Sequence, residues 1–274
     1  MRKDFTGIPG SDWHLAGGTY HFSGPPDDCT GTLSVVNHSD QRIRIRRLQT
    51  VQPSRSRKGF TPLTQTRIRL RTTVAPNSDA EASARLELPD NIAPGRYLAL
   101  LKTGDEKITL EVDVEATRRL ELDPEEHLLV GRAAEPVSFR VDVLNAGNVP
   151  VNILPMMPVW LLEEDWNQRV LVSVLQESGD TDDFATVAQR LLERARQDIP
   201  APAEVQASPA PPLTLAPGDT TTLTLSLTLP ENLAVGREYA GHVRINEERV
   251  DLEVYCEGPA AHPNMEPPAV VTNN

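Results

Sequence analysis

Apolar and polar residues alternate along several short segments of the chain. Every second residue of 137–143 is apolar, and in 223–229 leucines alternate with threonine and serine. A period of two is typical of β-strands that bury one face. Because clusters of Pro, Gly, Asn and Asp separate these segments, the sequence predicts an all-β chain built of sandwiches.

The strand pattern occurs twice. The segment 31–37 matches 139–145 at an offset of 108 positions, and 75–89 matches 216–230 at an offset of 141. The second copy therefore carries 33 extra residues in its middle. Self-similarity of this kind predicts a tandem duplication.

The duplication sets the expected domain boundaries. We expect a first sandwich over 13–116 and a second over 117–257. The N-terminal residues 1–12 are expected to be flexible. The tail 258–274 is expected to be disordered, because it is rich in Pro and small residues.

The extra residues of the second copy contain a segment with helical spacing. Phe184, Val187 and Leu191 fall on one face of a helix expected at about 181–199. The Pro/Ala run that follows, 200–212, is expected to be an extended spacer. We expect the helix to cap an open end of the second sandwich, and docking of a partner is the alternative.

Turn and core motifs of the second copy resemble those of a known group of domains. Asn145-Ala-Gly147, Ala216-Pro-Gly-Asp219 and Gly236-Arg-Glu-Tyr239 resemble bacterial immunoglobulin-like domains of the NEW3 and CARDB type. They are also similar to the wider group of Ig-like modules of the major-sperm-protein and pilus-chaperone kind. The first copy departs from the pattern, with Asn77-Ser78 where Gly-Asp is expected. The resemblance implies two tandem immunoglobulin-like β-sandwiches, which usually bind, space or present other molecules rather than catalyse.

Charge is distributed unevenly along the 274 residues. The chain has 27 Lys+Arg and 39 Asp+Glu, a formal net charge of −12. Residues 1–116 have 16 basic and 14 acidic side chains, whereas the remainder has 11 and 25. Within the first copy, 41–78 contains ten basic side chains and no acidic one.

Two of these basic segments alternate with apolar residues. In Arg42-Ile-Arg-Ile-Arg46 and Arg67-Ile-Arg-Leu-Arg71, alternation predicts four apolar side chains in the core and six arginines outside. The loop between them adds further basic residues and is expected to close on a partner. The predicted partner-binding residues are Arg42, Arg44, Arg46, Arg55, Arg57, Lys58, Arg67, Arg69 and Arg71.

Like charges on neighbouring strands are unfavourable, so negative charge is expected over these arginines. An acidic protein surface, including a second copy of this chain, ranks first, and acidic side chains of neighbouring strands rank second. Nucleic acid ranks last, because the chain is acidic overall and Phe60 is the one aromatic residue in the basic region.

We find no catalytic or metal-binding motif to which a reaction can be assigned. The six histidines lack ligand spacing, and no Cys-x-x-Cys is present. His14 and His21, followed by Asp27-Asp28-Cys29, form a local group of possible metal ligands. We interpret them as ordinary polar residues of a loop. Helix capping explains the acidic run 180–183 better than a calcium loop does. No cofactor is predicted.

The sequence therefore favours a non-enzymatic adaptor or scaffold protein that assembles with another protein through charge-complementary surfaces. The alternative is an accessory binding module of an extracellular or carbohydrate-active system. The N-terminal sequence has no apolar stretch typical of a signal peptide, so we expect a cytoplasmic protein without a membrane span. Cys29 and Cys256 are expected to be reduced structural thiols.

Overall fold

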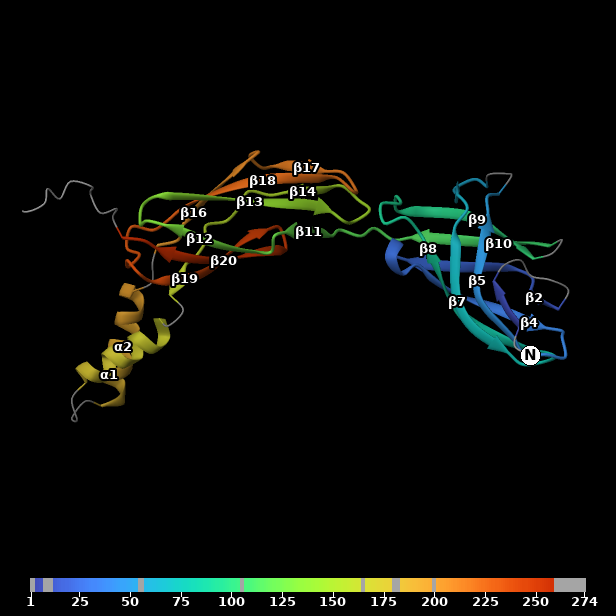
Figure 1. Ribbon diagram of the computed structural model, residues 1–274, viewed down its shortest axis with the longest axis horizontal. Helices are drawn as coiled ribbons and strands as arrows, with labels where there is room; N and C mark the ends of the chain where they lie inside the picture. The colour runs from blue at the N-terminus through green and yellow to red at the C-terminus, as the bar shows by residue number, and fades with distance from the viewer. Residues whose placement is uncertain are drawn as a thin grey trace, which may run out of the picture. The chain divides into compact units, whose positions relative to one another are not determined.

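The computed structural model describes residues 3–6, 12–53, 57–103, 106–163, 166–178, 183–198 and 201–258, and most of its elements are β-strands (Figure 1). Two compact units can be distinguished. The first comprises Met1–Glu121, Leu144–Asn152 and Thr214–Thr220. The second comprises Leu122–Val143, Ile153–Leu213 and Thr221–Asn274.

The first unit contains ten strands joined in one sheet. They are β1 (Lys3–Thr6), β2 (Trp13–Leu15), β3 (Thr19–Gly24), β4 (Thr30–Asn37), β5 (Ile43–Val51), β6 (Thr61–Pro62), β7 (Arg67–Val74), β8 (Ser78–Glu87), β9 (Gly95–Thr103) and β10 (Glu106–Val114), with a short 3-10 helix at Pro26–Asp28.

Hydrogen bonds run around this sheet as a closed circuit. The order β5-β7-β8-β4-β3-β10-β9 returns to β5, because Thr50 and Val51 pair with β9. The register of β5 on β7 shifts between Ile45 and Arg47, and a bulge of this kind bends a strand. β5 pairs with β7 as far as Gln49 and with β9 at Thr50 and Val51, so it joins strands that a sandwich would place in separate sheets.

Alternation builds the core of the first unit. Ile43, Ile45, Ile68 and Leu70 are at most 2% exposed, which confirms the orientation predicted for these two strands. Their side chains belong to the same buried cluster as Trp13. The apolar positions of β4 and β8 also face inward.

Two four-stranded sheets and a helical pair make up most of the second unit. The strands of this part of the chain are β11 (Leu120–Asp123), β12 (Glu126–Gly131), β13 (Pro136–Asn145), β14 (Val151–Ile153), β15 (Leu162–Glu163), β16 (Glu204–Ser208), β17 (Leu213–Leu215), β18 (Thr220–Thr228), β19 (Glu238–Ile245) and β20 (Glu248–Cys256). The helices are α1 (Trp166–Glu177) and α2 (Phe184–Asp198).

The strand order of these sheets is immunoglobulin-like. One sheet has the order β11-β13-β18-β16 and the other β12-β20-β19-β15, and the two lie as layers in Figure 1. Immunoglobulin domains place their A, B, E and D strands in one sheet and C, F and G in the other. The observed sheets follow this order, with β12 added in parallel beside β20.

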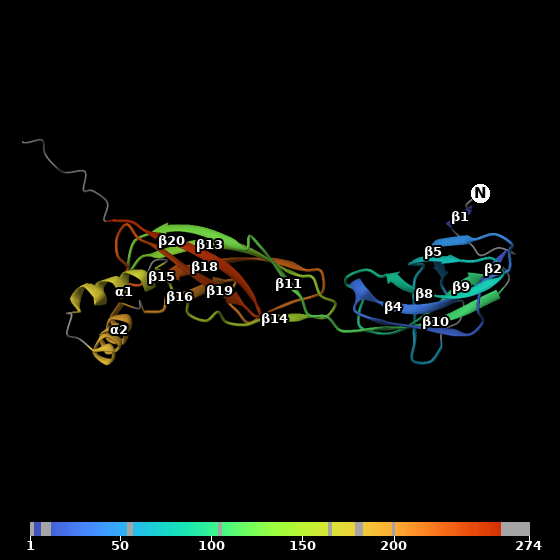
Figure 2. The same cartoon turned by 90° about the horizontal axis from the view of Figure 1, so that it is seen from below.

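The structure modifies several expectations about the second half of the chain. A helix was expected at about 181–199, and α2 lies within that range; Figure 2 shows α1 beside it, which was not predicted. The expected spacer 200–212 is more than a connection, because β16 lies within it and pairs with β18.

The chain termini were also expected to lack structure. Lys3–Thr6, within the segment 1–12 expected to be flexible, pairs as β1 with β5. Residues 259–274 of the expected disordered tail lie outside the described residues. Among the described helices, none is both long and apolar enough to cross a membrane.

Matching turns of the two copies share an uncommon backbone conformation. Asn77 has a φ of 49° and Gly218, which lies 141 positions later, has a φ of 81°. Asparagine tolerates this left-handed region better than most side chains. Its side chain therefore explains how the first copy forms the turn without the expected glycine.

Candidate protein-binding surface

The basic surface is built by the antiparallel pair β5 and β7. Arg44 lies opposite Thr73, and Arg47 lies opposite Arg69. Because their apolar neighbours are buried, the arginines of both strands are exposed. The amphipathic pattern of the two strands is thus sufficient to gather positive charge on one face.

A β-bulge adds one arginine that was missing from the predicted set. The register shift between Ile45 and Arg47 leaves both Arg46 and Arg47 exposed, while Leu48 is buried. The sequence does carry a signal for this bulge. Two polar residues in succession, Arg46 and Arg47, interrupt the alternation of the strand.

Five arginines surround a hollow on this surface. Its volume is about 460 Å³ and its lining residues all come from β5 and β7. We call this hollow the arginine face; it consists of Arg44, Arg46, Arg47, Arg69 and Arg71.

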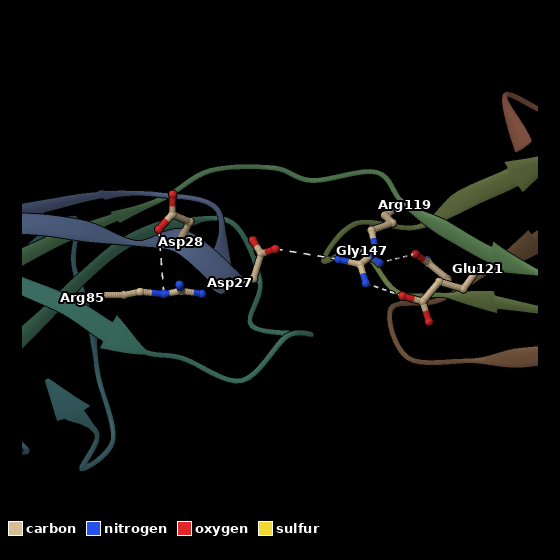
Figure 3. A network of polar contacts seen from close by, with 7 residues as sticks. Asp27, Asp28, Arg85, Arg119, Glu121 and Gly147 are labelled. Atoms are coloured by element: carbon tan, nitrogen blue, oxygen red, sulfur yellow. Dashed lines mark hydrogen bonds and ion pairs between the residues drawn. The ribbon is translucent and has the colours of Figure 1, made fainter. Parts of the chain in front are cut away.

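Like charges oppose one another across three strands. Arg69 on β7 lies opposite Arg47 on β5 and, on its other side, opposite Arg85 on β8. Local carboxylates offset part of this charge. The Nε of Arg69 donates to the carboxylate of Glu87, and the Nε of Arg85 lies 3.8 Å from Asp28 Oδ1 (Figure 3).

The Glu87 carboxylate responds to the positive charge around it. The hydrogen bond from Arg69 lowers the pKa of Glu87, and the charges of Arg69, Arg67 and Arg47 lower it further. Glu87 therefore stays ionised to a lower pH than an ordinary glutamate does. No ion pair with a described side chain joins Arg44, Arg47 or Arg71 within 4.0 Å, so local pairing accounts for only part of the face.

The structure separates the predicted partner-binding residues into groups. Arg44, Arg46, Arg69 and Arg71 line the arginine face. Arg42 is exposed just before β5, and Arg67 is exposed opposite Glu87. Arg55 lies outside the described residues.

Arg57, one of the predicted partner-binding residues, is not among the residues that line the arginine face. Its Nη1 lies 2.5 Å from Oε1 of Glu111 on β10, and its guanidinium lies 5.2 Å from the centre of the Phe60 ring. Arg96 lies 4.4 Å from the same ring and 3.9 Å from Glu111. The loop is held to β10 because charge pairing and cation–π contact act together there. Lys58, beside it in the same loop, is exposed.

His14, His21 and Cys29, which are close in sequence and could have been metal ligands, make separate contacts and do not form one site. His14 stacks on His38, with ring centres 4.7 Å apart and a 2.9 Å contact between ring nitrogens. His21 lies 3.6 Å from Glu111 instead. Cys29 is buried and unpaired with Cys256, which is also buried. Burial and the nearby Asp113, Asp28 and Glu115 raise the pKa of the Cys29 thiol to about 11.

Two acidic segments have structural contacts. Asp183 accepts a 2.8 Å hydrogen bond from the backbone N–H of Thr186, which confirms its expected role as a helix cap. Glu163 contacts Arg169 at 2.7 Å and Arg237 at 2.9 Å. Asp183 thus caps α2, and Glu163 links β15 to α1 and to Arg237.

Comparisons with known proteins find similar solved structures but no matching family. No protein-family model and no curated protein matches the chain. Similar solved structures include the Pseudomonas aeruginosa CupB2 chaperone, with 11% identity and a TM-score of 0.22 over 88% of this chain and 98% of that chain. The E. coli chaperone DraB has 10% identity and a TM-score of 0.24 over 91% and 100% of the two chains.

A third similar structure is Dpr11 IG1 bound to DIP-gamma. It has 11% identity and a TM-score of 0.28 over 90% of this chain and 100% of that chain. The fold class rests on this protein's own strand order, which is that of an immunoglobulin-like β-fold.

Proposed function

We propose that this protein is a non-enzymatic adaptor whose arginine face binds an acidic surface of a partner protein. The observation that carries the proposal is that Arg47 and Arg69 lie opposite each other on adjacent strands, while Arg44, Arg47 and Arg71 have no ion pair with a described side chain within 4.0 Å. Directly opposed like charges destabilise a sheet, and carboxylates brought by a partner relieve this repulsion. Arginine also forms paired hydrogen bonds with carboxylates.

The adaptor role follows from the duplication. The left-handed turns at Asn77 and Gly218 occupy matching positions, and each half of the chain carries its own β-structure. We therefore interpret the protein as tandem Ig-like domains with a helical insertion in the second. The first domain would bind through its basic strands, and the second would remain available for a further contact.

Charge reversal provides the test. Arg44, Arg46 and Arg69 are changed together to Glu, and binding of a polyglutamate peptide is measured by fluorescence anisotropy at increasing salt. A control variant changes Arg118, Arg140 and Arg244 to Glu, which alters net charge equally at exposed positions that do not line the face. We expect salt-sensitive binding that the control retains and the first variant loses by about tenfold or more.

A single-stranded DNA oligonucleotide of equal charge serves as the competing probe. Tighter binding of the oligonucleotide than of polyglutamate would contradict the proposed protein partner. Equal binding by both triple variants would show that the arginine face is not the site.

A further inference from the structure

The edge of the sheet that contains β12 is open. Among the described strands, β12 ends its sheet and pairs with β20 alone. The carbonyls of Glu125 and Gly131 accept hydrogen bonds from Asp251 and Glu257 at 2.8 and 2.7 Å. Because residues of a parallel strand point their backbone groups alternately to either side, those of Glu126, Leu128 and Val130 point to the open edge.

The same residues carry apolar side chains on the outer face of the sheet. Leu128 is 71% exposed and Val130 is 51% exposed. Tyr255, which is directly beside Val130 on β20, is 38% exposed. An open edge and an exposed apolar row therefore coincide on one strand.

The two edge strands of the facing sheet, β16 and β11, have polar outward residues. The outward residues of β16 are polar: Glu204, Gln206 and Ser208. Those of β11 are Glu121 and Asp123. Charged or polar side chains discourage pairing at sheet edges. β12 lacks this protection beyond its first residue, so its sequence favours pairing with another strand.

We propose that β12 pairs antiparallel with β12 of a second copy of this chain. Alignment about Leu129 places Leu128 of each copy opposite Val130 of the other. The same alignment places Glu126 opposite Arg132, the residue that follows β12. The strand is thus complementary to itself in both shape and charge.

Neighbouring alignments lack this complementarity. A two-fold centre at Leu128 pairs Leu128 with itself but places Glu126 opposite Val130. A centre at Val130 pairs Val130 with itself but places Leu128 opposite Arg132. Of these three, only the centre at Leu129 leaves no charged residue opposite an apolar one and joins acidic to basic residues. There Leu128 and Val130 also exchange backbone hydrogen bonds, and the two sheets become one eight-stranded sheet across the dimer.

The full-length chain is tested by sedimentation velocity over a wide range of concentration. We expect a reversible dimer in the wild type. E126R and R132E each place like charges opposite one another twice, so each variant should raise the dissociation constant by about tenfold or more. In an equimolar mixture of the two variants, the side chain at position 126 of either chain meets one of opposite charge at position 132 of the other. Association should therefore be restored in the mixture.

Control variants separate the strand pairing from general effects of charge and exposure. E204R reverses an exposed glutamate on the edge strand β16, and V172K changes a valine of α1 that is 50% exposed. Both should dimerise normally, whereas L128K should be monomeric. Circular dichroism of each variant shows whether folding is retained.

A wild type that stays monomeric at all concentrations would overturn the proposal, as would failure of the mixed variants to associate. An L128K variant that is folded and still dimeric would also overturn it. The triple arginine variant described above leaves β12 unchanged and should dimerise. Loss of polyglutamate binding and loss of dimerisation are therefore independent outcomes.

Discussion

Asn37 and Asn145, 108 positions apart, make the same local hydrogen bonds in the two copies of the repeated pattern. Each amide donates to the carbonyl four residues later, at 2.8 Å to Gln41 and 2.9 Å to Val149. Each side-chain oxygen accepts from the backbone N–H two residues later. Both asparagines also donate to a distant strand or its end, and both are at most 1% exposed. Each asparagine side chain therefore provides hydrogen-bond partners for backbone groups of its turn.

Replacing either asparagine should destabilise the fold strongly. In Asn145→Ala the buried Leu215 carbonyl, the buried Gly147 N–H and the half-buried Val149 carbonyl lose their partner, at a cost of about 3 kcal/mol in the free energy of unfolding. Urea denaturation measures the effect. The exposed Asn232 provides the control, because Asn232→Ala should change stability by about 0.5 kcal/mol or less. Equal effects at the two positions would contradict the interpretation.

The Cys29 thiol should make stability fall at alkaline pH. Its pKa of about 11 in the folded protein lies above the ordinary value of 9.0. The unfolded chain therefore loses this proton first, and the stabilising contribution, complete below pH 9, is lost as pH rises toward 11. Between about pH 8 and about pH 10.5, the wild type should lose about 2 kcal/mol relative to Cys29→Ala.

The same burial should protect Cys29 from reagents. Native protein at about pH 8 should react slowly with an aromatic disulfide reagent at both cysteines, and urea-unfolded protein should react at once. Rapid labelling of Cys29 in the native protein, with the modified residue identified by mass spectrometry, would show that the thiol is accessible.

Arg69 should control the ionisation of Glu87. Because the hydrogen bond from Arg69 is the largest cause of the lowered pKa of Glu87, Arg69→Gln should raise this pKa toward its ordinary value. The stabilisation that Glu87 provides is present above the ordinary glutamate pKa and is lost as pH falls through the lowered one. Carboxyl-carbon NMR titration measures both proteins, and Arg71→Gln is the matched control. A larger shift in the control would refute the assignment.

Gly147 should not tolerate even a methyl group. A Cβ there would lie 2.3 Å from the carbonyl oxygen of Thr117 and 2.9 Å from the backbone nitrogen of Arg119. Gly147 is labelled beside Arg119 in Figure 3. Since neither backbone atom can turn away, Gly147→Ala should lower the free energy of unfolding by about 1–3 kcal/mol. Gly17→Ala, with no atom within 4 Å of its Cβ, should have a small effect in the same urea experiment.

Alternation predicted the orientation of β5 and β7 because it depends on neighbouring residues alone. Ile43 and Leu70 are buried where expected, and Arg44 and Arg69 are exposed. The position of Arg57 depends on Glu111, which is 54 residues away. Local sequence patterns carry no information about such a contact, so the sequence could not place Arg57 beside Glu111.

The helical pair was only half predicted for a related reason. The α2 segment begins with an acidic cap and has apolar residues at helical spacing. The α1 segment, by contrast, contains Val170-Leu-Val-Ser-Val-Leu175, a composition that equally suits a strand. Its helical state depends on packing, since Val170 and Val174 are buried and lie one helical turn apart.

The bulge at Arg46 shows how an extra cation is accommodated without disturbing the interior. In a strand without a bulge, one inserted residue would turn Leu48 and every later side chain to the opposite face of the sheet. Here the irregular step absorbs the insertion, so Leu48 still packs inward and Thr50 still reaches β9. Deleting Arg46 would accordingly remove one positive charge and restore strict alternation of buried and exposed residues from Ile45 to Leu48.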